Sequence, residues 1–162
     1  MSPQKTLRNA FGNFGTGVAI IGVHDTKGRA VGLTINSFAS VSLEPPLLSW
    51  CLDNNSQLYD EITAAKRFTV NILAADQRTL SDRMARPGNH GFSEAEWFAS
   101  ATGTPFVSGA LAQFDCHIHQ IVEAGDHALF IGGIDEVLAC EERRSALVYF
   151  RGAYARLDGE AV

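Results

Sequence analysis

Residues 32–56 of the chain read GLTINSFASVSLEPPLLSWCLDNNS, and this stretch decides the fold. Residues 30–38 predict a strand, and the apolar run 47–52 predicts a second, buried strand. Glu44-Pro45-Pro46 separates the two, because proline lacks the backbone N–H that regular structure needs. Ser56 is then expected to cap a helix that extends to about Lys66.

Sequence on both sides of this stretch predicts further strands and few helices. Asp25-Thr26-Lys27-Gly28 is expected to form a hairpin turn between a strand at residues 18–24 and the strand at residues 30–38. Additional strands are expected at residues 18–24, 68–73, 111–123, 127–138 and 146–151. A helix follows Ser2-Pro3 and ends at Gly12, and Asp76 is expected to cap another that carries Leu80 and Met84.

Residues 86–109 form a long excursion rich in Gly, Ser, Thr and Pro, with a short helix predicted at 93–96. The order of elements is many strands with a few helices, without regular βα alternation. We therefore predict a mainly β (α+β) fold, a Greek-key or barrel-like β domain with a few peripheral helices. The 162 residues fit a single domain that spans 1–162.

Composition narrows the classes of function. Hydrophobic residues make up 46% of the chain and charged residues 19%, which excludes a disordered protein. The net charge of −5 disfavours a nucleic-acid partner, and the longest apolar run, Val18 to Val23, is too short to cross a membrane. The three cysteines lack Cys-x-x-Cys spacing, and residues 1–20 lack the apolar core of a signal peptide. We expect reduced thiols in a cytoplasmic protein.

Two patterns resemble functional motifs but favour simpler explanations. Gly12, Gly15 and Gly17 form G-x-x-G-x-G, yet no strand precedes them and no helix follows, so turn glycines are the better interpretation. His117 and His119 share one face of a strand, but no third ligand is spaced to complete a metal site. A solvent-facing or partner-facing strand is favoured, and no metal is expected.

Three polar segments interrupt apolar strands and are the candidates for chemistry. The first is Thr34-Ile35-Asn36-Ser37, which continues through Ser40 and Ser42. The second is Cys51 to Ser56, where a strand ends and a hydroxyl at the start of the next helix could bind a phosphate. The third is Gly125-Asp126-His127, at the start of a strand. Each segment taken alone is also compatible with ordinary strand alternation or a hairpin turn.

Taken together and in order, these segments resemble the flavin reductase-like family of short two-component reductases. The resemblance covers residues 6–157. It is carried by FGNFGTGVAIIG, the stretch quoted above, RFTVNIL, ATGTPFVSGALAQFDCHI, AGDHALFIGGI and LVYFRGAY. The block SVSLEPPL and the Gly125-Asp126-His127 block make it specific.

The resemblance implies an FMN-binding split β-barrel, and with it a role for each polar segment. Thr34, Ile35, Asn36 and Ser37 would face the isoalloxazine edge, with Ser42 in the continuation of that segment. Cys51, Leu52 and Asp53 would run along the ring and ribityl chain, and Ser56 would hold the phosphate. His127 would lie beside the nicotinamide, and Phe150 and Arg151 would help close that site.

One position departs from the family pattern. Where relatives often carry a Lys/Arg-Phe pair in the long loop, this chain has Gly91-Phe92. Arg83 or Arg86 is the candidate to replace the missing positive charge. The choice between FMN and FAD stays open.

The function implied is an NAD(P)H:flavin oxidoreductase. It would transfer hydride from NADH or NADPH to FMN or FAD, and supply reduced flavin to a partner monooxygenase. The family also implies a homodimer. Two alternatives stay open: a flavin-binding protein of the same fold without turnover, and a reductase that uses bound flavin to reduce another acceptor.

Overall fold

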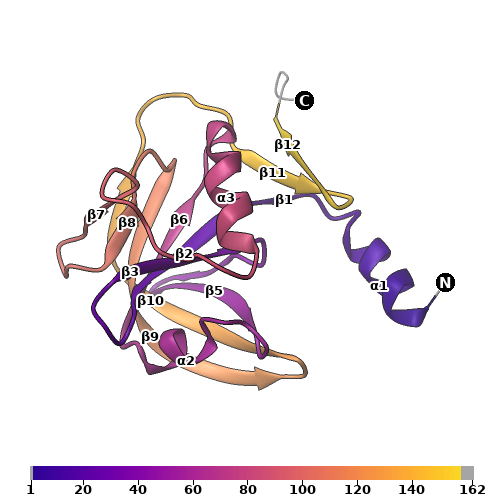
Figure 1. Ribbon diagram of the computed structural model, residues 1–162, viewed down its shortest axis with the longest axis horizontal. Helices are drawn as coiled ribbons and strands as arrows, with labels where there is room; N and C mark the ends of the chain where they lie inside the picture. The colour runs from indigo at the N-terminus through magenta and orange to yellow at the C-terminus, as the bar shows by residue number, and fades with distance from the viewer. Residues whose placement is uncertain (1, 158–162) are drawn as a thin grey trace.

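The structure is a computed structural model that describes residues 2–157, and a curled antiparallel sheet dominates it (Figure 1). The seven strands of this sheet lie in the order β3-β2-β6-β9-β10-β5-β4. Their bounds are β2 (Ala19–His24), β3 (Ala30–Ile35), β4 (Ala39–Leu43), β5 (Pro46–Asp53), β6 (Arg67–Ile72), β9 (Ala112–Ala124) and β10 (His127–Ala139). Strand makes up 49% of the chain and helix 17%, so the prediction of a mainly β fold is confirmed.

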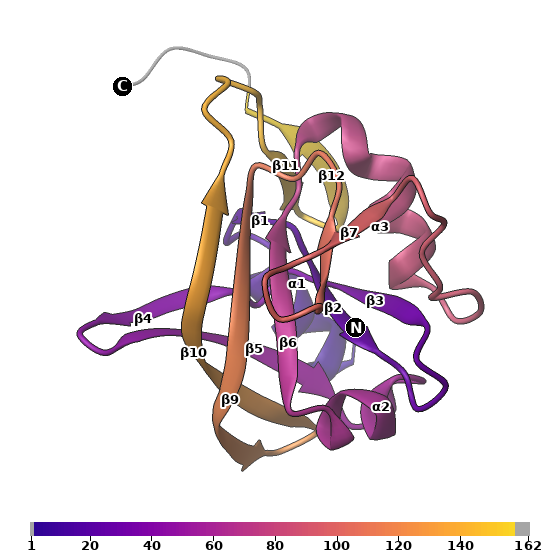
Figure 2. The same cartoon turned by 90° about the vertical axis from the view of Figure 1, so that its left-hand side faces the viewer.

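Smaller elements surround the sheet. A three-stranded sheet contains β1 (Thr16–Gly17), β11 (Leu147–Phe150) and β12 (Ala153–Arg156), and a two-stranded one contains β7 (Trp97–Ala99) and β8 (Pro105–Val107). The helices are α1 (Pro3–Phe11), α2 (Tyr59–Ala64), the 3-10 turn Ala75–Gln77 and α3 (Arg78–Ala85). Helix α1 stands away from the sheet, and the hairpin of β4 and β5 projects from one side (Figures 1 and 2).

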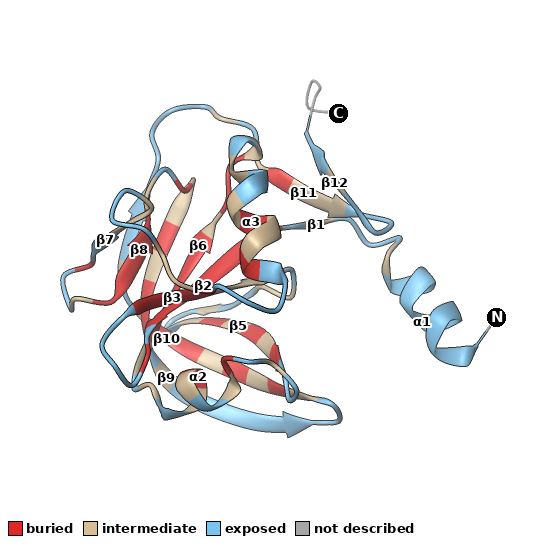
Figure 3. Ribbon diagram, in the orientation of Figure 1, coloured by how far each residue is buried: buried red, intermediate tan, exposed pale blue. Residues whose placement is uncertain are grey.

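Three aromatic rings fill the centre of the main core. Trp50 stacks on Phe130 with ring centroids 4.6 Å apart, and Phe68 meets Trp50 edge-on at 5.6 Å. All three side chains are at most 1% exposed. Figure 3 shows that the buried positions concentrate on the strands. Gly132 lies under the Phe68 ring, where an added Cβ would come within 2.5 Å of the ring edge.

A second core lies beneath α3, built from Val18, Ile20, Leu73, Met84 and Leu147. Leu80 packs against its edge, so the predicted apolar face of this helix is confirmed. Helix α3 thereby closes one side of the sheet, next to β3 (Figure 2).

Several predicted boundaries were wrong. The strand expected at 30–38 ends at Ile35, and a separate strand, β4, begins at Ala39. Ser56 does not cap a helix: α2 begins at Tyr59, and the Ser56 hydroxyl accepts from the Leu58 N–H in a local turn. Asp76 lies inside the 3-10 turn instead of capping α3.

Two more differences lie in the second half of the chain. Residues 93–96 form a turn, because Glu96 bonds back to Ser93 through both its backbone and its carboxylate. The segment 146–151 is one arm of a hairpin whose other arm, β12, the sequence analysis missed. Arg151 and Gly152 both have positive φ, 49° and 80°, the conformation that tight hairpin turns require.

Strand β8 crosses close over β2 at Gly22. Thr69 donates a 2.5 Å hydrogen bond to the Pro105 carbonyl there, and Asn71 accepts from the Val107 N–H at 2.8 Å. A Cβ on Gly22 would lie 2.6 Å from both the Pro105 oxygen and the Thr69 hydroxyl. The backbone of β8 therefore leaves no room for a side chain at this position.

We expect Gly22→Ala to lower the free energy of unfolding by about 1–3 kcal/mol, as overpacking of a core does. Gly17→Ala is the matched control, since no atom lies within 4 Å of its built Cβ, and it should stay within about 0.5 kcal/mol of wild type. Urea unfolding with a common m-value measures both. Equal midpoints for the two variants would contradict the close approach of β8.

Candidate functional site

One polar pocket of about 410 Å³ gathers most of the predicted site residues. It lies between the end of β3, the end of β5, the start of β10 and the segment after α3. Its lining residues are Leu33, Thr34, Ile35, Asn36, Ser37, Cys51, Asp53, Asn55, Ser56, Gln57, Ala85, Arg86, Pro87, His90 and His127. The volume is in the range of small-molecule and cofactor sites.

Alternation along β5 places its polar residues in this pocket. Leu48, Trp50 and Leu52 point into the core and are at most 1% exposed. Side chains of a strand point to opposite faces in turn, so Cys51 and Asp53 line the pocket instead. Leu52, which the sequence analysis placed along the ring, points into the core and does not line the pocket.

Strand pairing then places His127 at the same end. His127 is paired with Asp53 in the register of β10 and β5. Its Nδ1 lies 2.7 Å from the Asp126 carboxylate, and this hydrogen bond lowers the pKa of Asp126. Two of the three polar segments thus meet across one strand pair.

Residues 34–37 form the opposite wall, and most of their side chains have structural partners. Thr34 donates its hydroxyl to the Ser81 carbonyl at 2.7 Å, and Ile35 is buried. Ser37 accepts from the Cys51 N–H at 2.9 Å, which ties this wall to β5. Asn36 is exposed, and residues 36–38 lie outside the strand pairing that ends at Ile35 and resumes at Ala39. Asn36 is the one exposed residue of this wall.

The far end of the pocket carries hydroxyl, amide and cationic groups. These groups belong to Ser56, Gln57 and Arg86, and Oε1 of Gln57 lies 3.3 Å from Nε2 of His90. Arg86 forms a 2.8 Å ion pair with Asp82. Of the two arginines proposed from the sequence, the structure brings Arg86 to the pocket.

Arg83 lies outside this pocket. Its guanidinium pairs with Glu96 at 2.6 Å and donates to the Gly91 carbonyl. The hydrogen bond with Glu96 raises the pKa of Arg83, and the same contact lowers that of Glu96. Phe92 also lies outside, because its ring packs over Gly32 in the second core. Ser42 lies on β4, away from the pocket lining.

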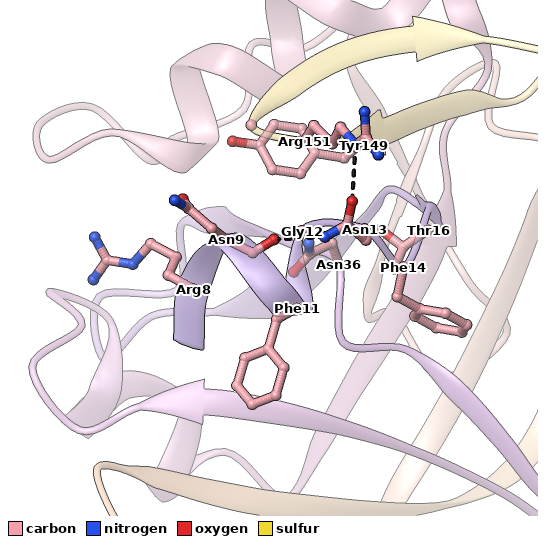
Figure 4. Close-up of a pocket in the computed structure, with 11 residues that line it drawn as sticks. Arg8, Asn9, Phe11, Gly12, Asn13, Phe14, Thr16, Asn36, Tyr149 and Arg151 are labelled. Carbon is pink, nitrogen blue, oxygen red and sulfur yellow. Dashed lines mark hydrogen bonds between the residues drawn. The ribbon is translucent and has the colours of Figure 1, made fainter. Parts of the chain in front are cut away.

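Arg151 lines a second hollow of about 840 Å³, between α1 and the β11–β12 turn. Its Nε donates to the Asn13 side chain at 2.9 Å, drawn as a dashed line between these two residues in Figure 4. The backbone N–H of Arg151 donates to the Gly12 carbonyl. Asn36 lines both hollows, so they adjoin. Phe150 lies under the Arg151 guanidinium at 5.0 Å and is 40% exposed. The structure places this pair beside the His127 pocket and not inside it.

Sequence reasoning missed His90 and Gln57 as pocket residues. His90 is buried in the long excursion, where its spacing from other polar residues gives no signal. Among residues 2–157, no three His, Cys, Asp or Glu side chains gather as a possible metal site. In the same residues no helix is long and apolar enough to cross a membrane.

Residues 11–158 match a known family, the flavin reductase like domain. The chain belongs to this family. The reductase component of the trigonelline monooxygenase of Acinetobacter baylyi is 40% identical over 150 residues, which cover 93% of this chain and 48% of that protein. The NADH-using FMN reductase of Agrobacterium fabrum is 37% identical over 156 residues, 96% of this chain and 87% of that one. The chain spans about half to two thirds of the length of several curated relatives.

Solved structures share the fold over the whole chain. The NADH:FAD oxidoreductase of Streptomyces globisporus, solved with NAD and FAD fragments, has a TM-score of 0.90 and 31% identity. The match covers 99% of this chain and 96% of that one. The fold is therefore that of the flavin reductases, as the sequence resemblance implied.

The three cysteines differ in environment, and all are free thiols. Burial raises the pKa of the Cys116 thiol to about 12, and the nearby Asp115 and Asp135 carboxylates act in the same direction. Burial also raises the pKa of Cys51, which lines the pocket. Cys140 is exposed.

We expect a thiol-specific disulfide reagent to label Cys140 first and Cys51 slowly in the folded protein. Since the thiolate is the reactive form and both raised pKa values favour the thiol, the Cys51 rate should still increase above about pH 9. Cys116 should react only after unfolding. Cys140→Ser is the control that removes the fast phase, and labelling of Cys116 in the native protein would contradict the assignment.

Proposed function

We propose that residues 1–162 act as one domain with NAD(P)H:flavin oxidoreductase activity. The observation that carries the proposal is the pocket that gathers Thr34–Ser37, His127 and four residues of the segment 51–56, Cys51, Asp53, Asn55 and Ser56, in a chain of the flavin reductase-like family. Relatives named for reduction of FMN or FAD with NADH support the reaction type.

The flavin is FMN or FAD, and the pocket residues fit it in chemistry and size. Backbone groups of Asn36 and Ser37 and the Asn36 amide suit the polar edge of an isoalloxazine ring. Cys51 and Asp53 would lie beside the ring and ribityl chain, and Ser56 would offer a hydroxyl donor to the phosphate. A further hollow of about 530 Å³ shares Thr34, Ile35, Asn36, Ala85 and Arg86 with the pocket, so the longer FAD also has a path.

When bound, the flavin supplies the hydride acceptor, and NADH or NADPH supplies the hydride. Transfer requires the two rings to stack at about 3–3.5 Å. The residues of this chain position the rings and exclude water. His127, whose ring is held by Asp126, would hold the nicotinamide amide, and no proton transfer by its ring is needed.

The reduced flavin is proposed to serve a partner monooxygenase. Support comes from relatives that are named as reductase components of such two-component enzymes. A cytoplasmic location agrees with three free thiols and with the need for reduced nicotinamide. The two alternatives, a flavin-binding protein without turnover and a reductase of another acceptor, are distinguished by the experiments below.

We expect purified protein to quench flavin fluorescence and to speed NADH or NADPH oxidation in proportion to added FMN, FAD or riboflavin. A variant of Cys140, which is exposed and outside the pocket, serves as the control and should retain the full rate. Quenching without faster nucleotide oxidation would favour the non-catalytic alternative. Nucleotide oxidation that requires an acceptor other than flavin would favour the alternative of a reductase that uses bound flavin to reduce another acceptor.

Ser56→Ala and His127→Ala should fail in different ways. A hydrogen bond to a charged phosphate contributes about 1.5–3 kcal/mol, so Ser56→Ala should weaken FMN about 10- to 150-fold and leave riboflavin nearly unchanged. His127→Ala should raise the KM for the nucleotide and leave FMN affinity close to wild type. Fluorescence titration and steady-state kinetics measure both. Equal losses for FMN and riboflavin in Ser56→Ala would instead assign Ser56 to its turn with Leu58.

We also propose a homodimer. Leu7, Phe11 and Phe14 are 54%, 69% and 79% exposed, and no residue of α1 is buried, so a second copy has apolar surface to cover. Light scattering should give twice the 17.5 kDa chain mass, and Phe11→Asp should shift the protein toward the monomer. A wild-type monomer at micromolar concentration would contradict the proposal.

A further inference from the structure

The imidazole of His90 is held between two hydrogen-bond acceptors. Its Nδ1 lies 3.0 Å from the Gly32 carbonyl oxygen, and its Nε2 lies 3.3 Å from Oε1 of Gln57. A backbone carbonyl only accepts. The Gln57 atom is fixed as oxygen because the Gly88 N–H donates to it at 2.8 Å, and an NH₂ group there would place donor against donor.

These partners select the protonation state of the ring. A neutral imidazole carries one N–H and satisfies one acceptor, whereas the imidazolium donates from both nitrogens. His90 is only 8% exposed, so a nitrogen left without its bond would have little water to replace it. The backbone is fixed as well, since the Gly32 N–H donates to the His90 carbonyl at 2.8 Å. The ring that carries a proton on each nitrogen is the form that satisfies both acceptors.

Charged groups face His90 from two sides. Arg86, Asp53 and His127 line the pocket with it. On its other side a smaller hollow contains Asp25, Arg29 and Glu61. Each side presents at least one carboxylate together with one arginine, so the hydrogen-bond partners of the ring, and not these charges, decide which form of the ring fits.

The other basic groups of the pocket have acidic partners. Arg86 pairs with Asp82, and His127 pairs with Asp126. His90 instead bonds to two neutral acceptors, so these bonds leave its positive charge uncancelled. That charge lies next to Gln57, whose neighbour Ser56 lines the same end of the pocket.

We propose that protonated His90 supplies positive charge to the phosphate end of this pocket, so that affinity for phosphorylated flavin depends on its protonation. The ring acts through charge, because both nitrogens already bond to the protein. The inference rests on the proposed function, since it assigns the phosphate of the flavin to this end of the pocket.

The test compares FMN and riboflavin affinity in wild type, His90→Gln and the control His24→Gln, from about pH 5.5 to pH 8.5. His24 is exposed, bonds to the Gly103 carbonyl and lies outside the pocket. We expect His90→Gln to weaken FMN about two- to fivefold at the acidic end, with the difference shrinking as pH rises. Riboflavin should be unaffected. The FMN phosphate itself titrates near pH 6, which changes the charge of the ligand. This change is the same for every variant, so it cancels when the variants are compared at one pH.

A second measurement needs no variant. Nitrogen-15 spectra of the histidine rings in the wild-type protein report whether each nitrogen carries a proton. We expect both nitrogens of His90 to carry protons in the FMN complex at the acidic end of this pH range, where each ring nitrogen can donate to its acceptor. A single proton there, or equal effects of His90→Gln on FMN and riboflavin, overturns the inference while flavin binding stands. Wild type that binds no flavin overturns the proposed function and this inference with it.

Discussion

The stack of Trp50 on Phe130, with centroids 4.6 Å apart, is the contact on which the rest of the structure depends. The two rings lie on directly paired residues of β5 and β10, so the stack fixes the register of these strands. With Trp50 turned inward, strand alternation turns Cys51 and Asp53 to the other face. The same register places His127 opposite Asp53. One aromatic pair therefore builds the core and aligns two walls of the pocket.

A buried polar network provides the second constraint, because it fixes the excursion after α3 to the sheet. Asn71 donates to the Ile20 carbonyl and accepts from the Val107 N–H, and Thr69 donates to the Pro105 carbonyl. Buried polar groups stabilise a fold only when they are satisfied, so this network admits one placement of β8. The excursion also contains His90, which closes the pocket. The position of His90 is thus determined by contacts of the excursion with the sheet and not by the loop alone.

Local patterns predicted the longer strands and the three polar segments that meet at the pocket, since alternation at β5 and the turn at 25–28 are properties of short segments. Long-range contacts decided the rest. Ser56 has the residue type of a cap, but its hydroxyl serves a turn before α2. Phe92 was predicted as a site residue from its place in the Gly91-Phe92 pair, but its ring packs over Gly32. His90 gave no signal because its partners, Gly32 and Gln57, are 58 and 33 residues away in the chain.

The chain has a net charge of −5, yet its proposed ligands are anions. Long-range attraction therefore contributes little, and binding must come from groups within a few ångströms. Arg86 is already shared with Asp82, and Asp53 opposes an anion. What remains is a set of hydroxyls, backbone amides and the proposed His90 imidazolium, each of which would add a modest increment to the binding free energy. A site built this way favours a flavin that exchanges readily. Exchange is what a reductase needs if its product is to act on a separate enzyme.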